Sequence, residues 1–116
     1  MKAEVYKIFN DVQTRTNTRE NLDKFVSLFE KGRVKEFNEA MENVFLIIMK
    51  NYEKNNVVLK NIKEFIKNFI EKIVKIAKVK DNTKKFLNNF CQLFTNNTKK
   101  PKYKTLCLYF LSKKYF

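Results

Sequence analysis

The stretch VLKNIKEFIKNFIEKIVKIA, residues 58–77, decides the fold class of this 116-residue chain. Its apolar side chains recur every three or four residues, which is the period of an α-helix and not that of a half-buried β-strand. Because the apolar arc is wide, we expect this helix to be the longest and the central one, contacted from more than one side. The apolar positions are Val58, Ile62, Phe65, Ile66, Phe69, Ile70, Ile73, Val74, Ile76 and Ala77.

The same spacing continues on both sides of this stretch and predicts five further helices. Asn17 and Glu20 have the spacing of a capping box at the start of the second helix, and Gly32 has a C′ position after it. Asp81 begins the fifth helix, and Pro101 suits the first turn of the sixth. The apolar stripes of these five helices cover residues 5–12, 22–29, 34–48, 86–94 and 103–111.

Six helices with short links predict an all-α fold, in which antiparallel helix pairs stack as a short HEAT-like α-solenoid. A helical bundle is the alternative, because both architectures bury apolar stripes between neighbouring helices. The length fits a single domain, residues 1–116. One glycine and one proline are too few for a hairpin-rich sheet or a glycine-rich phosphate loop.

The residue types that carry most enzyme chemistry are scarce in this chain. It has no histidine, and its two cysteines, Cys91 and Cys107, lie within apolar helical patterns that favour core-filling thiols over a disulfide or a metal site. The carboxylates of Glu36, Glu39 and Glu42 are typical of a solvated helix face rather than a catalytic pair. We therefore expect neither an enzyme nor a bound cofactor.

The sequence has neither a recognisable signal peptide nor an apolar run long enough to span a membrane. The first ten residues alternate charged and apolar side chains without the apolar core of a signal peptide. The longest apolar run, residues 44–49, is far too short to span a bilayer. We expect a protein that is not secreted, in the nucleus on chromosomes or in the cytoplasm.

The charge is uneven along the chain, whose formal net charge is +13. Residues 1–58 carry 10 basic and 9 acidic side chains, whereas residues 59–116 carry 15 and 3. Biased base composition in the gene would explain the abundance of 22 lysines and 15 asparagines. It does not explain why acidic residues nearly vanish from the second half. The asymmetry therefore favours an anionic partner.

Two groups of lysines are candidates for phosphate binding, which needs many cations on one surface. One group, Lys60 and Lys63, lies on one flank of the helix over residues 58–77, where a solvated lysine face is an equal alternative. The second group lies at the start of the sixth helix, whose dipole adds attraction for anions. A membrane surface is the weaker partner, since six apolar stripes can cover one another. The second group is Lys99, Lys100, Lys102 and Lys104.

Three segments together resemble condensin complex subunit 3, the CAP-G type of HEAT-repeat subunit. The opening KIFNDVQ, residues 7–13, is similar to the start of that family. Residues 45–69, which include YEKNNVV leading into IKEF, resemble a helix, a short basic loop and a second helix. PKYKTL, residues 101–106, is similar to a Val-Arg-Phe-Arg-Val stretch that begins a helix of an early repeat. Family members are many times longer, so the resemblance covers only their N-terminal portion.

This resemblance implies a non-catalytic solenoid that grips the double-stranded DNA backbone in mitotic chromosome condensation, alongside a kleisin subunit and two coiled-coil ATPases. Lys54 carries over from a basic pair that contacts DNA, and Glu53 stands at the other position of the pair. Lys102 and Lys104 match the two arginine positions of the third segment. The alternative function is a small helical protein-interaction module whose lysine content reflects genome composition.

Overall fold

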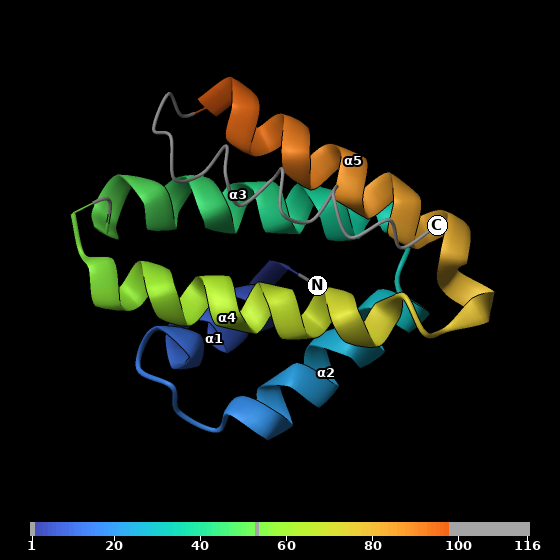
Figure 1. Cartoon of the computed structure of the whole chain (residues 1–116), viewed down its shortest axis with the longest axis horizontal. Coiled ribbons are helices and arrows are strands. Elements are labelled where there is room, and N and C mark those ends of the chain that lie inside the picture. The colour runs from blue at the N-terminus through green and yellow to red at the C-terminus, as the bar shows by residue number, and fades with distance from the viewer. Residues whose placement is uncertain (1, 53, 98–116) are drawn as a thin grey trace.

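A computed structural model describes residues 2–52 and 54–97 of the chain (Figure 1). Within them all regular structure is helical, which confirms the predicted fold class. The sixth predicted helix lies outside the described residues. The elements are α1 (Lys2–Gln13), α2 (Thr18–Lys31), α3 (Val34–Tyr52), α4 (Asn56–Ile73), the 3-10 turn η1 (Ala77–Val79) and α5 (Lys80–Asn97).

The helices stack as antiparallel pairs in two layers. α1 and α2 form one antiparallel pair, and α3 and α4 form the next (Figure 1). α3 packs against both α1 and α5, while α4 packs against α2, so odd-numbered and even-numbered helices make separate layers. α1 also packs against α4 across the layers. This order is that of a short solenoid, and the cross-layer contact gives it the single shared core of a bundle.

Phenylalanine rings fill that core. The ring centroid of Phe9 in α1 lies 5.4 Å from that of Phe25, 5.4 Å from Phe45 and 5.6 Å from Phe65, one ring from each of α2, α3 and α4. Edge-to-face ring pairs of this kind contribute about 0.5–1.5 kcal/mol each beyond the area they bury. The phenylalanine rings buried among the described residues are Phe9, Phe25, Phe29, Phe37, Phe45, Phe65, Phe69, Phe86 and Phe90.

α4 is contacted from more than one side, as its sequence predicts, by α1, α2 and α3, although α3 packs against α1, α2, α4 and α5 and is at least as central. α4 is also shorter than predicted, and α3, with 19 residues, is the longest helix among those described. α4 ends at Ile73, the chain turns at residues 74–76, and η1 then leads into α5. This turn buries Val79 and lets the hydroxyl of Thr83 donate to the Val79 carbonyl at 2.8 Å. Ile73 and Ile76 keep helical spacing across the turn, so the apolar periodicity of the sequence does not reveal that the helix ends there.

Two predicted helix ends differ in detail from the structure. Asn17 precedes α2 in the left-handed conformation, with φ 50° and ψ 43°, and its side chain makes no capping hydrogen bond, so the predicted capping box with Glu20 is wrong. Gly32 does follow α2, but its backbone is extended, with φ −82° and ψ 166°, and its amide donates to the Leu28 carbonyl at 2.8 Å. A side-chain cap occurs instead at α4, where Asn55 accepts from the Val58 amide at 3.2 Å.

Candidate nucleic-acid interface

The outer face of α4 carries two of the predicted site lysines. Lys60 and Lys63 are exposed, because Phe65, Ile66 and Phe69 turn the opposite side of the helix into the core. Lys54 is exposed one residue before the cap of α4. Lys60 and Lys63 lie within roughly the first two turns of the helix, and Lys54 lies just before it. The first turn contains no acidic residue, so the positive end of the helix dipole adds to their potential.

Arg15 links the turn between α1 and α2 to this part of α4, and we call its contacts with Asn61 and Glu64 the Arg15 clasp. Its Nε donates to Oδ1 of Asn61 at 2.7 Å, and its guanidinium also donates to Oε2 of Glu64 at 2.6 Å. The amide of Asn61, which is buried, donates to the carbonyl of Gln13 at 2.9 Å. Arg15 takes a left-handed backbone, with φ 56°, to reach these partners.

The clasp also changes the local charge. Glu64 is the sole acidic residue of the sequence between residues 54 and 70, and its carboxylate is the one that Arg15 pairs with. The negative charge closest in sequence to Lys60 and Lys63 is therefore offset by a cation from another helix pair. The N-terminal half of α4 presents a net positive surface for this reason.

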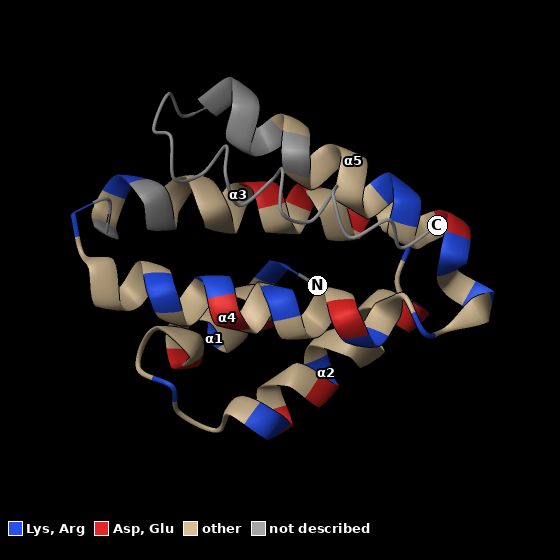
Figure 2. Ribbon diagram, viewed as in Figure 1, with Lys and Arg blue, Asp and Glu red and all other residues tan. Residues whose placement is uncertain are grey.

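Lysines near the other end of α4 have a different environment. Lys72 pairs with Asp23 at 3.3 Å and Lys78 with Glu30 at 3.2 Å, and both carboxylates belong to α2. Such surface ion pairs add about 0–1 kcal/mol to stability, but they offset the lysine charge locally. Figure 2 shows basic residues along α4, so the difference between its two halves lies in their partners rather than in lysine number.

The structure brings Lys54, Lys60 and Lys63 to one end of α4. The other predicted site residues, Lys99, Lys100, Lys102 and Lys104, lie outside the described residues. So do Cys107 and the side chain of Cys91. The prediction of a solvated face for Glu36, Glu39 and Glu42 is confirmed, since all three are exposed on α3.

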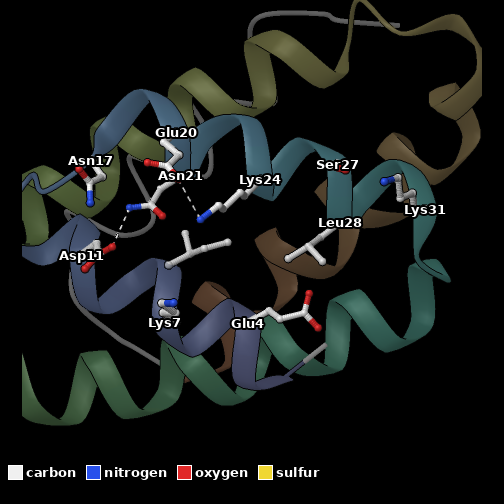
Figure 3. A pocket seen from close by; sticks show the side chains of 11 residues that line it. Glu4, Lys7, Asp11, Asn17, Glu20, Asn21, Lys24, Ser27, Leu28 and Lys31 are labelled. Carbon is white, nitrogen blue, oxygen red and sulfur yellow. Dashed lines mark hydrogen bonds and ion pairs between the residues drawn. The ribbon is translucent and has the colours of Figure 1, made fainter.

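A groove between α1 and α2, of about 700 Å³, had no signal in the sequence. Ile8 and Leu28 give it an apolar floor, and Asp11, which accepts from Asn21 at 3.1 Å, lies on its wall. Figure 3 shows how acidic and basic side chains alternate around it, with Glu20 and Lys24 paired at 3.2 Å. Because the groove forms between two helices whose charged faces each look merely solvated, periodicity alone does not reveal it.

In the part of the chain that the structure describes, no three His, Cys, Asp or Glu side chains gather as a metal site. None of the described helices is long and apolar enough to cross a membrane. In comparisons of the whole chain with known proteins, no family model, curated protein or solved structure matches it.

Proposed function

We propose that this protein is a non-catalytic, HEAT-like helical subunit that binds the backbone of double-stranded DNA. The N-terminal half of α4 supplies Lys54, Lys60 and Lys63, and the second group, Lys99, Lys100, Lys102 and Lys104, supplies further cations. Binding of this kind reads phosphates and has little base preference. The resemblance to condensin subunit 3 extends the proposal to chromosome condensation in the nucleus, with a kleisin and coiled-coil ATPases as protein partners.

One observation carries the proposal: lysines cluster where their local acidic neighbour is already paired. Lys60 and Lys63 are exposed, and neither forms an ion pair with a described residue, while Arg15 holds Glu64 at 2.6 Å. A face that serves only solubility does not need lysines gathered at one end of a helix, because interspersed charges of both signs serve solubility as well. A polyanion gains from it, since each neutralised phosphate releases counterions.

The test replaces Lys54, Lys60 and Lys63 together with Gln in the full chain. Duplex DNA is titrated over a salt series in a gel-shift assay. If each lysine contacts one phosphate, the slope of log K against log salt becomes less steep by about 2.7, at about 0.9 per phosphate. We expect the affinity at 0.15 M salt to fall at least tenfold, where screening limits the influence of distant charges to about 8 Å.

A matched control separates contact from overall charge. Lys24, Lys72 and Lys78 are changed together to Gln, which removes the same three charges from lysines that pair with Glu20, Asp23 and Glu30. We expect this control to alter the slope by less than one. An equal loss in both variants, or no binding of DNA by the unchanged chain at low salt, contradicts the proposal.

The second candidate is a protein-interaction module, and one observation favours it. Leu46, Ile47 and Val57 are large apolar side chains that the described structure leaves exposed. Tyr109, Tyr115 and Phe116 are further aromatic candidates for such contacts, and they lie outside the described residues. DNA binding that falls steeply with salt favours the first proposal, whereas negligible binding at low salt favours this one.

A further inference from the structure

The outer face of α3 combines exposed apolar and acidic side chains. Leu46 and Ile47 keep 38% and 41% of their surface exposed. Glu39 and Glu42 precede Leu46 by seven and four residues, and both are exposed. Residues at these spacings lie on one side of a helix. Figure 2 shows the acidic residues grouped on the middle of α3, beside the predominantly basic α4.

α5 ends near this face. Phe86 and Phe90 of α5 pack against Phe37 and Phe45 of α3, with ring centroids 5.5 Å and 5.4 Å apart. The later ring of α5 meets the later ring of α3, so the two helices run in the same direction. α5 continues beyond Phe90 for seven residues, to Asn97. Its end therefore lies beside the C-terminal half of α3, where Leu46 lies (Figure 1).

The chain that follows is complementary to this face in charge and in apolar content. Residues 98–116 contain six lysines and no acidic residue, and their apolar side chains have helical spacing over 103–111. An extended chain of this length reaches about 65 Å at most. The longest dimension of the molecule is 38 Å, so chain length does not prevent a contact with α3.

We propose that the outer face of α3 is the docking site for the chain's own residues 98–116. Leu46 and Ile47 take the apolar side chains of that segment, while Glu39 and Glu42 attract its lysines. Burial of the two exposed apolar side chains supplies the favourable free energy, at about 25 cal/mol per Å². The carboxylates give the contact its orientation and its dependence on salt.

Docking bears on DNA binding, and this consequence rests on the proposed function. The segment carries Lys99, Lys100, Lys102 and Lys104, which are predicted to contact phosphates. The same lysines cannot pair with Glu39 and Glu42 and with phosphate oxygens at once. The acidic face of α3 then competes with DNA for them, and the affinity for DNA is set partly by a surface that DNA does not touch.

The test uses trypsin, which cleaves after lysine, on the full chain without DNA. Glu39→Gln, Glu42→Gln and Leu46→Ser are combined in one variant. We expect cleavage after Lys99, Lys102 and Lys104 to become at least fivefold faster than in the unchanged chain, as followed by mass spectrometry. Cleavage at lysines within α1 to α4 is measured in the same samples and should not change, which shows that the fold persists.

A control variant combines Glu20→Gln and Asp23→Asn, which removes the same two negative charges from α2, away from α3. We expect its cleavage rate after the same three lysines to match that of the unchanged chain. Equal acceleration in both variants, or in neither, overturns the docking site. Protection that grows with protein concentration also overturns it, because the occupant is then the segment of a second copy.

A separate titration with duplex DNA keeps the two proposals distinguishable. The α3 variant should bind DNA at least threefold more tightly than the control variant. If the unchanged chain binds no DNA, the proposed function fails, while the protease result still decides the docking site. If trypsin supports docking and DNA affinity is equal in the two variants, the site stands and competition with DNA is refuted.

Discussion

The two halves of the outer face of α4 carry the same residue type in different surroundings. In the first half, Lys60 and Lys63 lie next to Glu64, whose charge Arg15 offsets at 2.6 Å. Towards the second half, Lys72 meets Asp23 of α2 at 3.3 Å. Lysine number is similar in the two halves, yet Lys60 and Lys63 form no ion pair with a described residue, whereas Lys72 is paired with a carboxylate of α2.

This difference shows that the electrostatic environment of a lysine on α4 depends on helices that are distant in the sequence. The contacts of Arg15 with Asn61 and Glu64 join residues 46 and 49 apart, and that of Lys72 with Asp23 joins residues 49 apart. The stacking of the first helix pair on α4 creates all three. A change in that stacking would therefore redistribute charge without altering a single charged residue.

The largest loss of stability is expected from Phe69→Ala, because the Phe69 ring packs α4 against α2 and so supports both halves of its outer face. Phe69 is fully buried, and its ring centroid lies 4.5 Å from Phe25, 5.6 Å from Phe29 and 5.5 Å from Phe86. Truncation of such a ring leaves a cavity and costs about 3–5 kcal/mol. Urea denaturation followed by circular dichroism measures the loss. A cost below about 1 kcal/mol would show that the aromatic cluster repacks and does not hold α2 against α4.

A smaller loss of stability is expected from Asn61→Ala, because Asn61 holds only the N-terminal half of α4 to the α1–α2 turn. Asn61 is buried, accepts from Arg15 and donates to the carbonyl of Gln13 at 2.9 Å. Its removal takes one partner from this part-buried carbonyl and one from Arg15, so the free energy of unfolding should fall by about 0.5–1.5 kcal/mol.

Asn68→Ala provides the control for this prediction. Asn68 lies on the same helix two turns later and is exposed, so its replacement should change stability by less than about 0.5 kcal/mol. The same urea denaturation compares the two variants. If they lose equal stability, the Arg15 clasp does not fasten the α1–α2 turn to α4.

Helical periodicity was sufficient to predict the fold class and the inner face of α4, because burial repeats with the helix. It missed the turn at residues 74–76, where Ile73 and Ile76 keep the spacing while the backbone leaves the helix. It also assigned Asn17 a side-chain cap, whereas the residue enters α2 through a left-handed backbone. Local spacing carries no information on φ, and the stacking of helix pairs decides where the chain must turn.

The candidate site was predictable only in part. The positions of Lys60 and Lys63 on the exposed side of α4 follow from the apolar stripe, and both are exposed. The pairing of Lys72 and Lys78 with α2 did not follow, since it depends on which helix becomes the neighbour. Arg15 gave no signal at all, because its partners lie on a helix 46 residues later.

The smallest effect concerns the ion pairs of the second half. Lys72→Ala and Lys78→Ala should each lower the free energy of unfolding by at most about 1 kcal/mol, because both lysines are largely exposed and water screens the pairs. The loss should shrink further in 1 M salt, where the screening length is about 3 Å. Lys60→Ala is the control: it breaks no ion pair with a described residue and removes a cation from a positive surface, so it should cause no salt-dependent loss of stability. Urea denaturation at two salt concentrations compares the three variants. An equal salt-dependent loss for Lys60→Ala would mean that the two halves of α4 do not differ in pairing, and the electrostatic contrast between them would be refuted.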